Sequence, residues 1–135
     1  MIVRAVEPTV SAASRLGAGG SVRSAAGSDA VQTFVLTGEF DLTNVDALEA
    51  AISDAIDAGA RDFVVDLSGV SFLDAGTFNA LVLARKRAAR RNGEFVLVRP
   101  PALVWRIFVL TGLAALFPTF ALLDAALRYF SSARN

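Results

Sequence analysis

The feature that most limits the possible folds is a short apolar run, residues 63–67 (FVVDL), between two segments with helical periodicity. A continuous run of this length is typical of a strand buried on both faces, and Ser68-Gly69 after it is typical of a turn. Before the run, apolar residues recur at i, i+3 and i+4 from Val45 to Ile56 and predict an amphipathic helix. After it, Asp74 is a suitable N-cap for a second helix that ends at Asn92-Gly93. This alternation predicts an α/β domain with a mostly parallel sheet and right-handed crossovers.

The remaining elements follow the same pattern. We expect Thr43 or Asn44 to cap the first helix and Gly59 to end it. Further strands are predicted at residues 31–37, 94–98 and 119–122, and further helices at about 102–110, closed by Gly112, and at 124–130. Residues 2–6 suggest a short opening edge strand, and residues 8–30, rich in Ser, Ala and Gly, suggest a flexible segment. The expected organisation is therefore a short strand with a flexible segment over 1–30 and one folded domain over 31–135.

Composition excludes several classes of chemistry. The chain has no cysteine and no histidine, so disulfides, cysteine-ligated zinc and histidine-dependent catalysis are excluded. Any catalysis would have to use carboxylates, Lys86, Tyr129 or hydroxyls. The 13 basic and 13 acidic side chains cancel, which gives no general attraction to nucleic acid. The basic run from Arg85 to Arg91 is interpreted as a solvated helix face, because no aromatic residues are interleaved with it.

The C-terminal part raises the question of a membrane span. No charged residue occurs from Ile107 to Leu123, which is a length at the lower limit for a span. Gly112 and Pro118 divide it into pieces of helix and strand size, and no aromatic and basic anchors flank it. We therefore predict that it forms the buried second half of the domain, without direct membrane insertion. The amino terminus lacks the pattern of a secretory signal, and we expect a cytoplasmic protein.

Four segments in order resemble the STAS domain, the fold of bacterial anti-sigma factor antagonists. They are residues 36–41 (LTGEFD), 65–74 (VDLSGVSFLD), 97–100 (LVRP) and 108–117 (FVLTGLAALF), within a resemblance that covers 31–130. The resemblance implies a four- to five-stranded mixed sheet with about four helices packed mainly on one face. It also implies a non-enzymatic, protein-binding function without a cofactor.

In that family, the turn that enters the second helix usually reads Asp-Ser-Ser/Thr-Gly, and a partner kinase phosphorylates the second hydroxyl residue. Here Asp74 matches the aspartate, Ala75 and Gly76 occupy the two hydroxyl positions, and Thr77 stands where glycine is usual. The conventional phosphoacceptor is therefore missing. Thr77 is a candidate displaced acceptor, although a hydroxyl bonded locally at the helix start is the favoured interpretation. The partner-binding residues implied by the resemblance are Asp41, Asp74, Ala75, Gly76, Thr77 and Asn79.

Three functions remain open on the sequence. The first is an anti-sigma factor antagonist that binds a kinase-fold anti-sigma factor and thereby releases a sigma factor. The second is an accessory subunit that binds the ATPase of a membrane lipid transporter, since some STAS proteins of that kind lack the phosphorylation switch. The third is a carboxylate or metal enzyme using Asp41, Asp66 and Asp74, which the absence of histidine and cysteine disfavours. The sequence does not indicate the oligomeric state.

Overall fold

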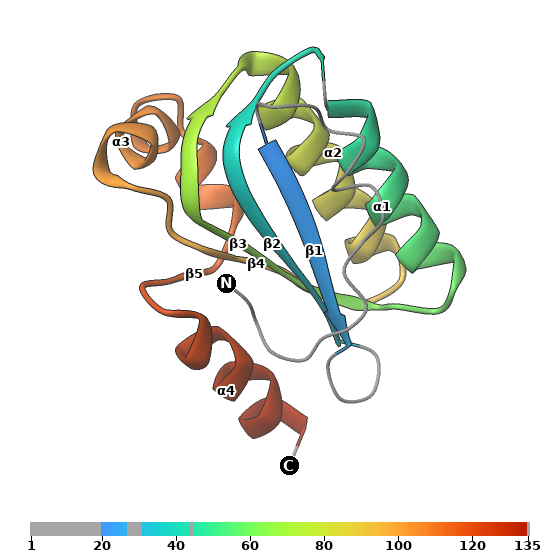
Figure 1. Cartoon of the computed structure of the whole chain (residues 1–135). Helices are drawn as coiled ribbons and strands as arrows, with labels where there is room; N and C mark the ends of the chain where they lie inside the picture. Colours follow the sequence, from blue (N-terminus) through green and yellow to red (C-terminus); the bar gives the residue numbers. More distant parts are fainter. Residues whose placement is uncertain (1–19, 27–30, 44, 135) are drawn as a thin grey trace.

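A computed structural model describes residues 20–26, 31–43 and 45–134, which form one α/β domain around a five-stranded sheet (Figure 1). The strands lie in the order β1-β2-β3-β4-β5; β1 is antiparallel to β2 and the other four are parallel. The elements are β1 Gly20–Ala26, β2 Val31–Phe40, α1 Val45–Asp57, β3 Asp62–Leu73, α2 Ala75–Arg90, β4 Phe95–Val98, α3 Ala102–Leu110, the 3₁₀ turn η3 Leu113–Leu116, β5 Thr119–Phe120 and α4 Leu123–Arg134. The mixed sheet and the four α-helices confirm the predicted fold class.

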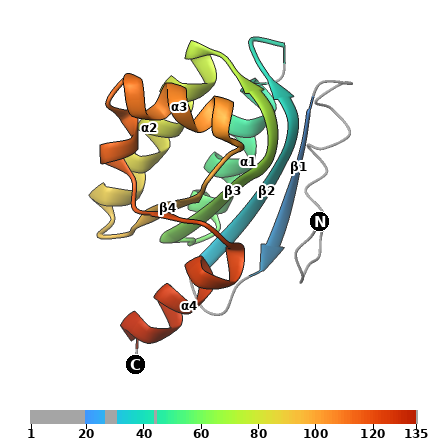
Figure 2. The ribbon, with the colours of Figure 1, turned by 90° about the vertical axis from the view of Figure 1, so that its left-hand side faces the viewer.

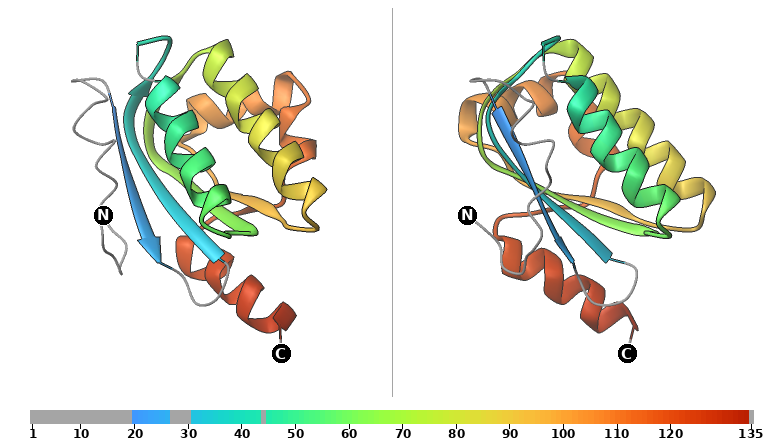
Figure 3. Two further views of the ribbon diagram at one scale, coloured as in Figure 1. Left: turned by 90° about the vertical axis from the view of Figure 1, so that its right-hand side faces the viewer. Right: turned by 45° about the vertical axis from the view of Figure 1, so that its right-hand side comes forward.

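Three helices cover one face of the sheet and the fourth covers part of the other. In β3, Phe63 and Val65 point into the core beneath α1, α2 and α3, whereas Val64 points to the opposite face. There it packs with Ala126 and Phe130 of α4. Figure 3 shows α1 and α2 side by side on one face, with α4 separate from them at the lower end of the sheet. The expectation that helices pack mainly on one face is confirmed.

Strand β1 corrects the prediction of a flexible segment over residues 8–30. Its seven residues pair antiparallel with β2, from Gly20 opposite Gly38 to Ala26 opposite Gln32. The segment GSVRSAA has little intrinsic strand preference, and it becomes a strand because it completes the ladder at the edge of β2. The predicted strand at 2–6 and the rest of the segment, 8–19 and 27–30, lie outside the described residues.

Strand β3 is longer than the apolar run that predicted it and passes through Ser68-Gly69 without a turn. Its register against β2 shifts twice, so that β3 contains two residues more than the stretch of β2 beside it. At the first shift, Asp66 Oδ1 accepts hydrogen bonds from the Ser68 N–H (2.9 Å) and the Ser68 hydroxyl (2.7 Å). Gly69 is required there, because a Cβ would lie 2.9 Å from Thr37 Cγ2. The turn-like residues thus form a bulge inside the strand.

The C-terminal part corrects a second expectation. Phe108 and Phe117 are buried in the core, as predicted for this segment, and α3 has the predicted bounds. However, Leu110 and Leu122 are 73% and 66% exposed, so the segment is only partly buried. In the described part of the chain, no helix is long and apolar enough to cross a membrane.

Glu94, just before β4, connects three elements at the lower end of the sheet. Its N–H donates to Asp62 Oδ1 (2.8 Å), and its carbonyl accepts from the Phe63 N–H (2.8 Å). Its carboxylate accepts a hydrogen bond from the Tyr129 hydroxyl of α4 (2.6 Å). Gly93 beside it has no room for a side chain, because a Cβ would overlap the Arg61 carbonyl oxygen. These contacts hold this end of the sheet together.

Candidate functional site

The start of α2 lies at the carboxyl end of β3, next to the end of β2. The Asp74 N–H donates to the Phe40 carbonyl (3.1 Å), which ties the two strand ends together. Asp74 has extended backbone angles, and its Oδ1 accepts hydrogen bonds from the Thr77 N–H (2.9 Å) and the Thr77 hydroxyl (3.0 Å). It is therefore the N-cap of α2, as the sequence predicts. The cap fixes the direction in which the first turn of the helix presents its side chains.

The first turn of α2 presents three of the predicted residues to solvent and buries the fourth. Ala75, Gly76 and Asn79 are exposed, whereas Thr77 is fully buried. The Thr77 hydroxyl is thus enclosed and bonded to Asp74, which matches the favoured interpretation of this residue. A Cβ at Gly76 would have only an ordinary contact, 3.5 Å from Asp74 Oδ1. A serine side chain would therefore fit at position 76.

Asp41 lies at the end of β2 and stabilises the turn that follows. Its Oδ1 accepts hydrogen bonds from the Thr43 hydroxyl (2.6 Å) and the Thr43 N–H (2.9 Å). The hydroxyl bond, followed by the N–H bond, lowers the pKa of the Asp41 carboxyl from its ordinary value. Thr43, one of the two predicted caps of α1, thus donates its hydroxyl to Asp41. Asn44, the other predicted cap, lies outside the described residues. Asp41 shapes the neighbouring turn.

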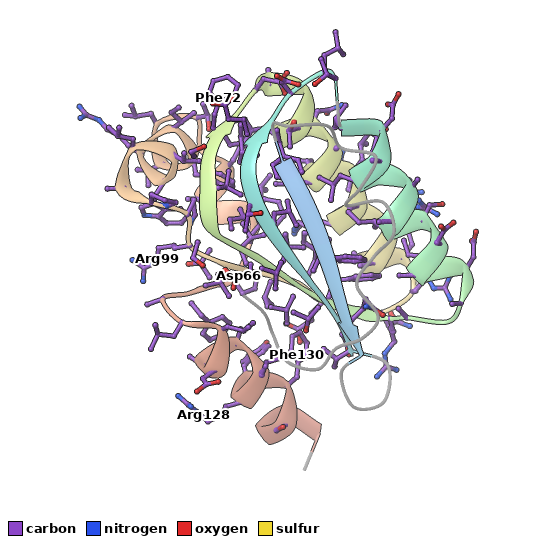
Figure 4. The ribbon with its side chains drawn as sticks, in the orientation of Figure 1. Asp66, Phe72, Arg99, Arg128 and Phe130 are labelled. Carbon is purple, nitrogen blue, oxygen red and sulfur yellow. The ribbon has the colours of Figure 1, made fainter. Side chains whose placement is uncertain are left out.

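Two exposed apolar residues at this end were not predicted as site residues. Leu42, after β2, is 81% exposed, and Phe72, near the end of β3, is 47% exposed. Figure 4 shows Phe72 at the same end of the sheet as the start of α2. The exposure of Phe72 is difficult to predict from the sequence. Its side chain faces outward because the register of β3 shifts just before it, so simple alternation along the strand does not apply. We refer to Leu42, Phe72, Ala75, Gly76 and Asn79 together as the α2 edge.

A groove between α1 and α2 begins next to the α2 edge, at Ala80. Its lining includes the buried residues Ile52, Ala80 and Ala84 and the exposed Leu83. Glu49 of α1 and Arg87 of α2 supply a charge of each sign. The groove is open to solvent, so a partner docked on the α2 edge could extend along it.

The three aspartates considered for metal or carboxylate chemistry are each used in a separate local structure. Asp41 bonds Thr43, Asp66 bonds Ser68 and Asp74 bonds Thr77. Among the residues that the structure describes, no group of three metal-ligating side chains comes together. The arrangement at this end therefore presents apolar side chains and a helix start, which suits contact with another protein.

The basic residues of α2 lie toward its other end. Lys86, Arg90 and Arg91 are exposed, and Arg85 and Arg87 are partly exposed. Arg87 and Arg90 lie in the last turn of the helix, where positive charge complements the helix dipole. The predicted solvated basic face is confirmed.

The family model of the STAS domain matches residues 23–126, and the chain belongs to this family. One relative is BtrV of Bordetella bronchiseptica, whose name assigns it provisionally to the anti-sigma factor antagonists. It is 28% identical over 98 residues, which cover 73% of this chain and 84% of BtrV.

Two solved structures are also similar. The crystal structure of an anti-sigma factor antagonist from Mycobacterium paratuberculosis has a TM-score of 0.71 and 30% identity, covering 87% of this chain and 96% of that one. The anti-sigma factor antagonist SpoIIAA in its unphosphorylated form has a TM-score of 0.72 and 21% identity, covering 82% and 97%, and supports the fold alone.

Proposed function

We propose that this chain is a regulatory anti-sigma factor antagonist, which binds an anti-sigma factor through the α2 edge and so releases a sigma factor. The observation that carries the proposal is the α2 edge itself: exposed apolar and small residues around a capped helix start, in a member of the STAS family. Relatives named as anti-sigma factor antagonists support a regulatory and not a catalytic role. The place of action we propose is the cytoplasm, with a kinase-fold anti-sigma factor as the partner.

We further propose that phosphorylation does not switch the site off. Gly76 has no hydroxyl at the position that corresponds to the family's phosphoacceptor, and the Thr77 hydroxyl is buried against Asp74. A kinase would have to unwind the first turn of α2 to reach Thr77. Binding would then be controlled by the amount of the protein or by its partner.

Calorimetric titration against the anti-sigma factors of the native cell tests the proposal. We expect the wild-type chain to bind one of them, and Gly76→Glu to weaken that binding at least tenfold. The glutamate is compatible with a helix N-terminus, so folding should be retained while a charge and a bulky side chain enter the contact. Ala89→Glu, at an exposed position near the other end of α2, is the matched control and should bind like wild type.

The outcome that contradicts the proposal is a folded protein that binds none of the anti-sigma factors. Affinity purification from the native cell then separates the alternatives. Recovery of a transporter ATPase in place of an anti-sigma factor would support the accessory-subunit function, for which a STAS fold without a phosphoacceptor is equally suitable.

A further inference from the structure

The outward face of α3 carries large apolar side chains that the described elements leave uncovered. Leu103, Ile107 and Leu110 follow at i, i+4 and i+7, so they lie on one side of the helix. Their side chains are exposed, and Ile107, the least exposed, is still at 43%. Val104 and Phe108, on the other side, are buried in the core. Figure 2, which looks onto this part of the molecule, shows α3 across the front of the ribbon. We call Leu103, Arg106, Ile107 and Leu110 the α3 face.

The charged residues of α3 and of the sequence on either side of it are both arginines. Arg106 is exposed and lies between Leu103 and Leu110 on the outward side, and Arg99 is exposed just before the helix. From Phe95 to Leu123 the sequence contains these two arginines and no acidic residue. The face therefore complements a negatively charged surface.

An aromatic residue lies beside the α3 face and packs partly against the core. Trp105, next to Arg106, is partly exposed, and the Arg99 guanidinium lies 5.7 Å from the centre of its ring. A helix that exposes apolar residues together with arginine and tryptophan has the composition of helices that lie in the interface of an anionic bilayer. Such helices lie on the membrane and do not cross it.

We propose that α3 binds peripherally to an anionic lipid bilayer. Leu103, Ile107 and Leu110 enter the boundary between headgroups and acyl chains, and Arg99 and Arg106 contact lipid phosphates. This inference concerns a different element from the α2 edge and does not rest on the proposed function.

A second copy of the chain fits the face less well than a membrane. Three apolar side chains on one short helix expose an area on the order of a few hundred Å², whereas a stable dimer buries about 800 Å² per partner. A two-fold contact between α3 helices would also bring the like-charged Arg106 side chains toward each other. An anionic bilayer provides apolar depth and negative charge together.

Vesicle flotation of the full chain tests the proposal, with vesicles of phosphatidylcholine alone or with phosphatidylglycerol added. We expect the protein to float only with the anionic vesicles, and less at high salt, because salt screens the arginine contacts. Trp105 is the single tryptophan of the chain, so its emission reports on α3 directly. Binding should move that emission to shorter wavelength.

Variants distinguish binding through the α3 face from non-specific adsorption to vesicles. Leu103→Gln combined with Leu110→Gln should abolish flotation, because the face loses its two most exposed apolar side chains. Since both side chains are exposed, we expect the variant to fold like wild type. Arg106→Gln should lower partitioning about fivefold, the effect expected for one basic residue near an anionic surface. Leu83→Gln, an exposed leucine of α2, is the matched control and should float like wild type.

The proposal is wrong if folded wild-type protein does not float with anionic vesicles, or if the double leucine variant floats as well as wild type. It is also wrong if light scattering shows a wild-type dimer that the double variant loses, because a second copy would then cover the face. Circular dichroism of each variant, with its unfolding midpoint, verifies that lost flotation is not lost folding.

Discussion

Gly76 occupies an exposed position in the first turn of α2, with room for a larger side chain. A Cβ there would meet Asp74 Oδ1 at 3.5 Å and no closer atom, and the glycine does not have a left-handed backbone conformation. A serine at this position would present its hydroxyl at the helix start, as the family's usual motif does. We therefore propose that the residue at position 76 determines whether this turn can be phosphorylated.

We predict that Gly76→Ser creates a phosphorylation site for a kinase-fold anti-sigma factor that binds the wild-type chain. After incubation with that partner and ATP, intact-mass spectrometry should show one phosphate on the serine variant and none on wild type or on Gly76→Ala. Phosphate adds about −1.5 to −2 charges, so the modified variant should also lose affinity for the partner. Detection of phosphate on Thr77 of the wild type would contradict the prediction, since that hydroxyl is buried.

The side chain of Asp74 contributes to stability as the N-cap of α2. One of its carboxylate oxygens accepts both the N–H and the hydroxyl of Thr77. We expect Asp74→Ala to lower the free energy of unfolding by about 1 kcal/mol, because the N-cap is lost and the Thr77 hydroxyl is left buried without this acceptor. Urea unfolding measures the change, and Asp74→Asn, which retains a capping oxygen, should lose much less. Equal stability of the alanine variant and wild type would contradict this role of Asp74.

At the scale of elements, an aromatic group and a hydrogen bond add to the apolar packing of α4 against the sheet. The Tyr129 ring lies 5.4 Å from that of Phe120 and 5.2 Å from that of Phe130, measured between centroids. Its hydroxyl donates to the Glu94 carboxylate (2.6 Å), which raises the pKa of Tyr129 above its ordinary value of 10.0. Burial and the negative charge of Glu94 act in the same direction.

This contact predicts a pH-dependent stability. Since the folded-state pKa of Tyr129 is raised, its contribution is fully present below pH 10.0 and is lost as the pH rises through the folded-state pKa. Tyr129→Phe should lower the free energy of unfolding by about 0.5–1.5 kcal/mol at neutral pH, and the difference from wild type should shrink in strong alkali. Chemical denaturation at several pH values checks this. A difference that stays constant through the alkaline range would show that the hydroxyl bond does not contribute.

Which elements could be predicted depends on whether their signals are local. The helices α1 and α2 were predictable because apolar spacing and the Asp74 cap lie within the segments themselves. Strand β1 was not, because a polar and small-residue segment becomes a strand only when β2 is beside it. The bulge at Ser68-Gly69 could not be distinguished from a turn, because the same residues are suitable for both. The register of β3 against β2 determines which of the two forms.

The candidate site shows the same division. Asp74 could be placed as a cap from its sequence position. The absence of the family's phosphoacceptor stays a prediction from the family motif. The burial of Thr77 and the exposure of Leu42 and Phe72 depend on how the strand ends pack against α2. This packing joins residues that are distant in the sequence, so no short segment predicts it. The exposure of Leu110 could not be predicted for a related reason: a long uncharged stretch does not reveal which of its residues face outward.

At the scale of the whole molecule, the two ends of the sheet differ in character. At the lower end, Glu94 joins β3, β4 and α4 through backbone and side-chain hydrogen bonds. At the upper end, the α2 edge exposes Leu42 and Phe72 beside a helix start. The domain thus has a firmly connected end, an end suited to docking and, on α3, a separate apolar and basic face.

The position of α4 has a practical consequence. Its last turn lies at the end of the molecule opposite the start of α2 (Figure 1). A biotin or fluorophore attached to an exposed position in the last turn of α4 would therefore stand away from the proposed docking surface. Immobilisation by that route would orient every copy with the α2 edge toward the flowing solution, so that sensor kinetics would report on that edge without obstruction.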